Sequence, residues 1–589
     1  MKQFFKYVLA TIVGIVISSI VIFLMFLGIV GAIVSSADKK EVKIEPNSIL
    51  YVDLKQEIVD RGSEDPFKGF DFASFQPNSP IGLNQILKAI ANAKEDSNIK
   101  GILLELDAVN AGAATTEEIR NALIDFKSSG KFIYAYSDTY SQKAYYLASV
   151  ADSVFLNPEG MIEWLGLRSE IMFFKKTLEK LGVEPQILRH GKFKSAVEPF
   201  MLDKMSPENR EQTLTYVSSI WNQWVKGISE TRGISADKLN SLANNMEIFN
   251  AKKAMENKLV DGLIYKDELI ATLKTKLGIE EKKDISSIEL KKYFKAPEVA
   301  KRKFSKDKIA VIYASGEIGM GEGGDDNIGS EGLSRTIRKA RRDSSIKAIV
   351  FRINSPGGSA LASEVIWREV DLAAKVKPVI VSMGDVAASG GYYIAAPATT
   401  IMANPTTITG SIGVFGLFFN LQKALDNKLG ITVDVVKTND HADFFSVFRP
   451  MTAEEKAVGQ MFIEQTYQTF IGHVSAGRGI PVEQVDAIGQ GRVWSGVNAK
   501  DIKLVDEFGG LTDAIKLAAE KAGLENYRLV ELPKQKKLFE QLMEDMSAEA
   551  KAWMLKDELG LSFKAYNRIK SMLNNQGVQA RMPYDIEVY

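Results

Sequence analysis

The sequence predicts an α/β fold that is built twice, and two observations lead to this prediction. Short apolar runs with the length of buried strands alternate with longer segments of helical periodicity, which is typical of parallel strands joined by crossover helices. The same order of elements then recurs in the second part of the chain. The strand-like runs cover residues 49–54, 101–106 and 132–136, and then 309–313, 348–353 and 379–381; helical segments such as 116–126 and 359–374 lie between them.

The recurrence keeps a nearly constant spacing. Asp-Ser-Asn-Ile-Lys at residues 96–100 returns as Asp-Ser-Ser-Ile-Lys at residues 343–347, which is 247 positions later. A Tyr-Tyr pair at 145–146 and an Asn-Pro pair at 157–158 also return after 247 positions. Arg-Gly-Ile at 232–234 and Lys-Leu-Val-Asp at 258–261 return after 246 and 245 positions. A register kept within two residues over this length indicates a duplicated module.

The duplication predicts how the chain is divided. We expect a first α/β module over residues 46–280 and a second over residues 308–530, joined by a charged linker at 281–307. Residues 1–45 are predicted to be a membrane anchor, and residues 531–589 a charged helical tail without a chemical role.

The anchor prediction rests on a long uncharged segment. No charged residue occurs between Lys6 and Asp38, and the apolar run over residues 8–34 exceeds the roughly 20 residues that a transmembrane helix needs. A cleaved signal peptide has a shorter apolar region of about 7–15 residues, so we expect an uncleaved single-pass helix. Lysines lie on both sides of this run, at 2 and 6 and at 39, 40 and 43, and therefore leave its orientation open.

Composition excludes several classes of function. Lys plus Arg and Asp plus Glu both number 74, so the chain has no basic excess of the kind a general nucleic-acid binder carries. There is no cysteine, which excludes disulfides, thiol catalysis and thiolate metal sites. With three histidines and no His-Glu-x-x-His pattern, a zinc hydrolase is disfavoured. We therefore expect neither a metal nor an organic cofactor.

Residues 378–393 contain the first candidate for chemistry. An apolar run at 379–381 is followed by Met-Gly-Asp at 383–385 and by Ala-Ser-Gly-Gly at 388–391. This pattern places Ser389 where a strand passes into the first turn of a helix. Free N–H groups and the positive end of the helix dipole gather there and could hold a developing oxyanion. The alternative is a tight strand-to-helix turn in which Ser389 is only a cap.

Alignment of the two modules shows which residues each retains. Ser389 aligns with Gln142, so the first module has no nucleophile at this place, and we expect Gln142→Ala to cost little peptidase activity. The turn Asn-Ser-Pro-Gly-Gly-Ser at 354–359 aligns with 107–112, which lacks the Pro-Gly-Gly. Backbone N–H groups at Gly357 or Gly358, with that of Gly390, could form an oxyanion hole. Pro-Gly-Gly alone is more often just a turn.

Lys194 is the candidate base. It lies in His-Gly-Lys-Phe-Lys-Ser-Ala-Val-Glu-Pro at residues 190–199, and no lysine occurs between Lys437 and Lys456 in the matching part of the second module. One module thus retains a serine and the other a lysine. A lysine can deprotonate serine if burial lowers its pKa from about 10.4 toward 7–8, a cost of about 4 kcal/mol. The alternative is an ordinary surface lysine.

Four motifs together resemble the long, duplicated form of the signal peptide peptidase A family, one of the Clp/crotonase-like serine–lysine proteases. They are Gly-Asp-Val-Ala-Ala-Ser-Gly-Gly-Tyr-Tyr at 384–393, Thr-Gly-Ser-Ile-Gly at 409–413, Gly-Lys-Phe-Lys-Ser-Ala-Val-Glu-Pro-Phe at 191–200 and Gly-Arg-Val-Trp-Ser-Gly at 491–496. The resemblance covers nearly the whole chain, including the anchor and the duplication. Asp385 departs from it, because glycine is common there, and this departure affects no catalytic residue.

The resemblance implies a crotonase/Clp-protease-like fold in each module and a serine endopeptidase whose dyad spans both modules. Ser389 would be the nucleophile, Lys194 the general base and Ser411 the residue that orients the lysine amine. The backbone of Gly358 and Gly390 would form the oxyanion hole. The resemblance further implies a homotetramer in the cytoplasmic (inner) membrane, with catalytic domains on the outer, periplasmic side. Its substrates would be hydrophobic peptides, above all signal peptides left after preprotein processing.

Three other interpretations remain open from the sequence. An acyl-CoA hydratase or hydrolase could use the same fold, since a fold does not determine a function. The chain could also be a non-catalytic membrane scaffold made of duplicated modules. Finally, His441, flanked by Asp440 and Asp443, could replace Lys194 as the base in a histidine triad.

Overall fold

The computed structural model describes residues 42–63, 79–299, 304–324, 326–535 and 577–582, and short stretches at 3–4, 6–7, 10–19, 21–22, 25, 70–71 and 76–77. Within these residues, no helix combines the length and the apolar character needed to cross a membrane. Much of the predicted anchor, including residues 26–41, lies outside the described residues.

The first module is organised around a six-stranded sheet in the order β10-β8-β7-β6-β1-β11, whose strands all pair in parallel. β11 and the short helix α11 (Leu290–Tyr293) lie inside the predicted linker, so part of that linker belongs to the edge of this sheet. The strands are β1 (Ser48–Val52), β6 (Ile99–Glu105), β7 (Phe132–Tyr140), β8 (Ser153–Ile162), β10 (Gly262–Leu263) and β11 (Ser287–Glu289). The helices are α2 (Leu83–Glu95), α3 (Ala113–Lys127), α4 (Gln142–Ala148), α7 (Pro207–Arg232), α8 (Ala236–Asn244), α9 (Ala251–Glu256) and α10 (Lys266–Leu277).

The second module repeats this plan in a sheet of order β21-β19-β17-β15-β12-β23, with β18 beside β17 and β22 beside β18. β23 extends past residue 530, so the predicted start of the tail falls inside this strand. The strands are β12 (Lys308–Ser315), β15 (Ile346–Ser355), β17 (Val379–Ala388), β18 (Thr400–Ala403), β19 (Ile408–Gly410), β21 (Val493–Ser495), β22 (Glu507–Phe508) and β23 (Arg528–Leu532). The helices are α12 (Ser330–Arg342), α13 (Ala360–Ala374), α14 (Gly390–Ala395), α16 (Ala453–Arg478), α17 (Val482–Ile488), α18 (Gly496–Asp501) and α19 (Leu511–Lys521).

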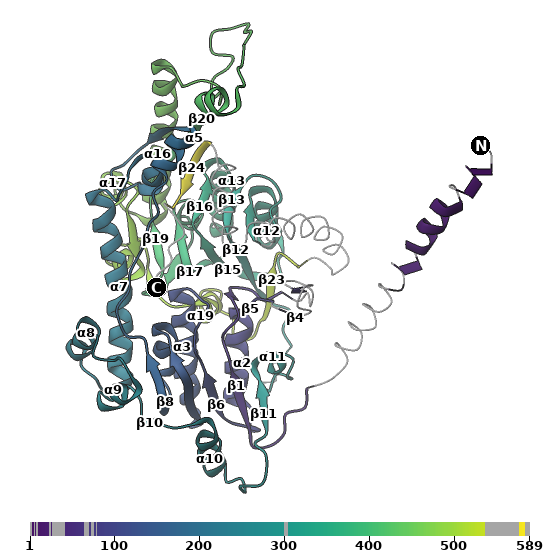
Figure 1. The fold of residues 1–589 in the computed structure, drawn as a ribbon, viewed down its shortest axis with the longest axis vertical. Coiled ribbons are helices and arrows are strands. Elements are labelled where there is room, and N and C mark those ends of the chain that lie inside the picture. The colour runs from purple at the N-terminus through teal and green to yellow at the C-terminus, as the bar shows by residue number, and fades with distance from the viewer. Residues whose placement is uncertain are drawn as a thin grey trace.

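The element bounds confirm the duplication. α2 and α12, and likewise α3 and α13, begin and end 247 positions apart. The spacing is 246 between α7 and α16, and it is 245 between the first residues of α10 and α19. The sequence spacing therefore reports a repeated three-dimensional unit. Figure 1 shows the first module, in purple and blue, below the second module, in teal and green.

The apolar patterns explain why these segments fold as they do. β15 and β17 are buried along nearly their whole length, as expected for parallel strands covered by helices on both faces. α2 buries Leu83, Ile86, Ala89, Ile90 and Ala93, a spacing of three or four residues that forms one helix face.

A third sheet joins the two modules, in the order β14-β13-β16-β24-β20-β9. β9 (Glu184–Arg189) comes from the first module and runs antiparallel to β20 (Phe415–Asn420) of the second. The other strands are β13 (Glu317–Gly319), β14 (Asn327–Gly329), β16 (Gly357–Ser359) and β24 (Gly577–Arg581). In Figure 1 the blue helix α5 (Lys175–Leu181), which precedes β9, lies beside β20 at the top of the second module. The first module thus extends a strand into the other module.

β24 comes from the predicted tail. The sequence pattern predicts a charged helix there, but residues 577–581 form a strand between β16 and β20 (yellow in Figure 1). The remaining parts of the tail, at 536–576 and 583–589, lie outside the described residues.

A buried ionic network also connects the modules. Arg352 of β15 is fully buried, and its guanidinium contacts the carboxylates of Asp60 and Glu118 at 2.7 Å each. Glu118 also accepts hydrogen bonds from the amide of Asn404 and the backbone N–H of Leu511. Acidic residues of the first module therefore neutralise an arginine in the core of the second.

Candidate active site

Ser389 lies between β17 and α14, as the sequence pattern predicts, in an unusual backbone conformation. Its φ is 56° and its ψ is −114°, which side-chain-bearing residues rarely adopt. Its backbone N–H donates to the carbonyl of Gly410 at 2.8 Å, and its carbonyl accepts from Tyr393 N–H at 2.8 Å. Such backbone strain persists only where neighbouring structure enforces it, and it is concentrated at functional sites.

Lys194 follows β9 and enters the second module. Its Nζ lies 2.8 Å from Ser389 Oγ, 3.1 Å from Ser411 Oγ and 3.1 Å from the carbonyl of Ser411. The side chains of Lys194, Ser389 and Ser411 are all fully buried. Burial lowers the pKa of Lys194 well below its usual value, because the ammonium loses its hydration and these three partners carry no charge.

The motif at 491–496 gives Lys194 the space it needs. A Cβ on Gly491 would lie 2.6 Å from both Cα and Cβ of Lys194, and the φ of Gly491 is 80°. A Cβ on Gly413 would lie 2.7 Å from Gly491 Cα and 3.3 Å from Lys194 Cδ. Phe193, the residue before the lysine, donates its N–H to the carbonyl of Gln490 at 3.0 Å. Glycines of the second module thus let the lysine loop of the first module approach closely. Gly413 and Gly491 belong to two of the sequence motifs, but the sequence predicted no role for them.

Ser411 is held in a position that favours contact with the amine. Its φ is 48°, and its backbone N–H donates to the carbonyl of Arg492 at 2.7 Å. Since both its hydroxyl and its carbonyl lie 3.1 Å from Lys194 Nζ, Ser411 restricts where the amine can be.

The three glycines proposed for the oxyanion hole gather beside Ser389. A Cβ on Gly357 would lie 2.7 Å from the backbone nitrogen of Gly390. Gly357 has a φ of 98°, a conformation that favours glycine. The strand β16 therefore brings the backbone of Gly357 and Gly358 against the residue that follows the serine.

The matching place in the first module is closed by a glutamine. Gln142 is buried, and its Oε1 accepts hydrogen bonds from the N–H groups of Leu165 and Gly166 at 3.0 and 2.9 Å. Its Nε2 donates to the carbonyl of Gly166 at 2.9 Å. Gly166 aligns with Gly413, whose carbonyl lies 3.4 Å from Ser389 Oγ. Gln142 is therefore a structural brace, a role that the sequence did not predict; the expectation that Gln142→Ala costs little activity stays a prediction.

The histidines do not join this site. The side chain of His441 is 56% exposed and lies 3.9 Å from Glu454 and 3.8 Å from Glu455. Asp443 binds Arg449 and Lys437 instead. His190 contacts Glu464 at 2.6 Å, and His473 contacts Glu364 at 2.9 Å. Among the described residues, no group of acidic or histidine side chains could hold a metal ion.

Asp385, the departure noted from the sequence, belongs to the module interface. Its carboxylate accepts hydrogen bonds from the N–H and the hydroxyl of Thr115 at 2.9 and 2.6 Å. Burial raises the pKa of Asp385, and these hydrogen bonds oppose the rise. The aspartate therefore helps to attach α3 of the first module and takes no part in the serine–lysine contact.

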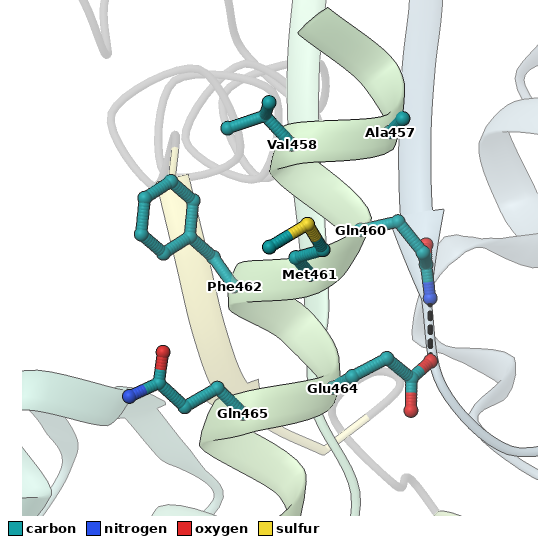
Figure 2. A pocket seen from close by; sticks show the side chains of 7 residues that line it. All are labelled: Ala457, Val458, Gln460, Met461, Phe462, Glu464 and Gln465. Carbon is teal, nitrogen blue, oxygen red and sulfur yellow. Dashed lines mark hydrogen bonds between the residues drawn. The ribbon is translucent and has the colours of Figure 1, made fainter. Parts of the chain in front are cut away.

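A separate surface pocket lies on α16 and is shown in Figure 2. Its lining includes the exposed side chains of Met461 and Phe462. The carboxylate of Glu464 accepts a hydrogen bond from Gln460 (dashed in Figure 2) as well as contacting His190. The residues that line this pocket include no nucleophile and none of the residues around Ser389, so the pocket is distinct from that site.

Gln142→Ala should lower the free energy of unfolding by about 1–3 kcal/mol, because the N–H groups of Leu165 and Gly166 lose their buried acceptor. Urea unfolding followed by circular dichroism measures this. The control is Gln465→Ala at an exposed position of α16, which should change stability by less than about 0.5 kcal/mol. An unchanged midpoint for Gln142→Ala would contradict its role as a brace.

Gly491→Ala should slow the reaction of Ser389 with a serine-directed acylating probe by about 10- to 100-fold, because the new methyl group displaces Lys194. Gly479→Ala is a matched control, since Gly479 also has a positive φ of 65° but no atom lies within 4 Å of its Cβ position. Equal reaction rates for the two variants would show that the close approach to Lys194 is unimportant.

Comparison with known proteins finds a matching peptidase family in both modules. The model of Peptidase family S49 matches residues 125–280 and 371–525, once in each module. The chain is 36% identical over 573 residues to "Protease 4" of Salmonella typhi, covering 94% of this chain and 91% of that protein. It is 34% identical over 514 residues to "Serine protease SPPA, chloroplastic" of Arabidopsis thaliana, covering 86% of this chain and 74% of that protein.

Among solved structures, ClpP1 from Listeria monocytogenes matches 35% of this chain and 94% of its own, with a TM-score of 0.23 and 18% sequence identity. The family model covers more than half of the chain and occurs in both modules, and two relatives match it over most of their length. The chain therefore belongs to peptidase family S49 and is a serine peptidase.

Proposed function

We propose that this chain is a membrane-anchored endopeptidase in which Ser389 is the nucleophile and Lys194 the general base. The observation that carries the proposal is the 2.8 Å contact between Lys194 Nζ and Ser389 Oγ. It joins two fully buried side chains from different modules. A lysine at a protein surface is protonated near neutral pH and cannot accept a proton. Burial among uncharged partners lowers the pKa of Lys194, so the neutral amine becomes available.

The reaction then follows from the positions of these groups. The amine of Lys194 accepts the proton of Ser389 Oγ as the oxygen attacks a peptide carbonyl carbon. N–H groups of Gly358 and Gly390 stabilise the negative oxygen of the tetrahedral intermediate. The ammonium of Lys194 gives its proton to the leaving amine when the peptide bond breaks. A water molecule, deprotonated by the same amine, then hydrolyses the acyl-enzyme.

Ser411 is proposed to position the amine. Its hydroxyl and carbonyl oxygens lie 3.1 Å from Nζ and stabilise an orientation directed at Ser389. The strained backbone of Ser411 and its hydrogen bond to Arg492 keep these oxygens in place. In this arrangement the lysine loses little conformational freedom during the reaction.

The proposed substrates are hydrophobic peptides, especially signal peptides released from preproteins. Support comes from a relative named "Putative signal peptide peptidase SppA" of Enterococcus faecium, which is 33% identical over 199 residues, 33% of this chain and 57% of that protein. The uncharged segment between Lys6 and Asp38 supports a single-pass anchor in the cytoplasmic membrane. The resemblance of the four motifs further supports a crotonase/Clp-like fold for each module, periplasmic catalytic domains and a homotetramer.

Ser389→Ala and Lys194→Met should each reduce hydrolysis of a hydrophobic peptide by at least about 10³-fold. Lys194→Arg should not restore activity, because the guanidinium stays protonated. In the wild type, kcat/KM should rise with pH through a limb well below the usual lysine pKa of about 10.4, since only the neutral amine is active. His441→Ala is the control and should keep activity within about two-fold, a bound set by its exposed position. An active Lys194→Met together with an inactive His441→Ala would reassign the base.

The full chain should sediment with membranes and keep its N-terminus, because about 20 apolar residues suffice to span a bilayer. N-terminal sequencing and protease accessibility in spheroplasts measure this. Residues after about position 46 should be digested from outside. A mature N-terminus near Ala37 would instead indicate cleavage, and protection from protease would indicate the opposite orientation.

A further inference from the structure

The loop that carries Lys194 into the second module is held by one side chain of its own module. Gln212 of α7 is buried, and its Nε2 lies 2.8 Å from Ser195 Oγ and 3.1 Å from the carbonyl oxygen of Phe193. Phe193 and Ser195 are the neighbours of Lys194 in the chain. One amide group therefore binds the backbone just before the lysine and the side chain just after it.

The same side chain also contacts the second module. Gln212 Oε1 accepts the backbone N–H of Val493 in β21 at 3.0 Å. Val493 comes two residues after Gly491, where a Cβ would lie 2.6 Å from Lys194 Cα. Gln212 thus joins the two segments between which the lysine lies. Because only Oε1 can accept the N–H of Val493, Nε2 must face the carbonyl of Phe193, and the amide has a single satisfactory orientation.

A buried chain of hydrogen bonds keeps this amide in place. Asn209, on the same helix, accepts from Gln212 Nε2 at 3.2 Å, and its own Nδ2 donates to the carboxylate of Glu198 at 2.9 Å. Glu198 is buried and also accepts hydrogen bonds from the N–H and the hydroxyl of Ser206, the N-cap of α7. The orientation of Gln212 is therefore fixed from the start of its helix.

The matching place in the second module holds different residues. α7 and α16 are 246 positions apart, so Gln212 aligns with Val458, which lines the surface pocket in Figure 2. Asn209 aligns with Glu455, whose carboxylate binds Arg449. The glutamine that holds the loop thus belongs to the module that supplies the lysine, and an apolar side chain takes its place in the module that supplies the serine.

We propose that Gln212 is a positioning residue for the peptidase reaction, which keeps the amine of Lys194 against Ser389 and out of contact with water. This inference rests on the proposed function of the serine and the lysine, and it extends that function to a residue outside the four sequence motifs.

The expected effect of losing Gln212 follows from the burial of the amine. Without its hydrogen bonds, the polar groups of the loop and of β21 are left unpaired in the interior, and they regain partners only when water enters. Water that reaches Lys194 Nζ hydrates the ammonium form and so raises the pKa of the lysine toward its ordinary value. A smaller fraction of the enzyme then has a neutral base near neutral pH.

The test measures kcat and KM of the full-length Gln212→Met protein in detergent for a hydrophobic peptide, from about pH 6 to about pH 10. Methionine has a similar volume but makes no such hydrogen bonds. At pH 7, kcat should fall about 10- to 100-fold while KM stays within about two-fold, because the peptide contacts are unchanged. The rising limb of kcat/KM should move toward the usual lysine pKa of about 10.4, so the loss should become smaller as the pH rises.

Gln223→Met is the matched control. Gln223 also lies on α7 and donates to Glu117 at 3.1 Å, so its replacement removes a side-chain hydrogen bond of the same helix without touching the lysine loop. This variant should keep kcat within about two-fold and leave the pH limb where it is. Urea unfolding of both variants shows how much stability each has lost.

Gln212→Glu is a second variant that preserves the shape of the side chain and therefore its packing. It keeps the acceptor for the N–H of Val493 but sets an oxygen against the carbonyl of Phe193, where a donor is needed. It should move the pH limb in the same direction as Gln212→Met, and it tests the inference even where the methionine variant does not fold.

The results separate this inference from the proposed function. Folded Gln212 variants with the pH limb of the wild type overturn the inference and leave the proposed function intact. A loss of kcat that is equal at every pH, or that also occurs in Gln223→Met, overturns it as well, because it would reflect a general weakening of α7. A wild type without a rising limb, together with an active Lys194→Met, contradicts both the inference and the proposed function.

Discussion

The structure depends on bringing a buried lysine amine from one module against a serine of the other. Lys194 and Ser389 are fully buried and meet at 2.8 Å, so a small shift between the modules would separate them. The buried amine also has a cost. Since its pKa is lowered in the folded protein, the unfolded chain binds the proton more readily at neutral pH, which reduces stability there. Other contacts must therefore hold the modules together.

Two kinds of contact do so. The antiparallel pairing of β9 with β20 carries the first module's chain directly to the site, and the lysine loop begins only a few residues after that strand. Deeper in the interface, Arg352 binds Asp60 and Glu118 without exposure to water. Removing one partner from a buried ionic group of this kind costs about 3–5 kcal/mol, because the remaining charges lose their compensation. Any other arrangement of the two modules would leave these buried charges unpaired and would therefore be unfavourable.

The duplication explains why each module holds only part of the site. Each module has a strand-to-helix turn at the matching place, but the first fills it with Gln142 and the second with Ser389. Gln142 makes three hydrogen bonds to the loop at 165–166 and thereby stabilises a turn that carries no nucleophile. The segment of the second module that aligns with β9, at 431–436, is exposed and forms no strand within the described chain. The two copies therefore differ in complementary ways around the proposed active site.

The sequence by itself determined the duplicated α/β plan, because hydrophobic periodicity and the spacing of a repeat can be read directly from the order of the residues. It also predicted the strand-to-helix setting of Ser389, and its resemblance to a family assigned Lys194 and Ser411. Only the tertiary structure decided that Lys194 is buried against uncharged hydroxyl and carbonyl oxygens, that Gly491 makes room for it, and that Gln142 is a brace. It also decided that residues 577–581 form a strand against β16, where the sequence predicts a charged helix. These features arise from contacts between residues hundreds of positions apart, and the free energy of such contacts depends on burial and geometry that no local pattern encodes.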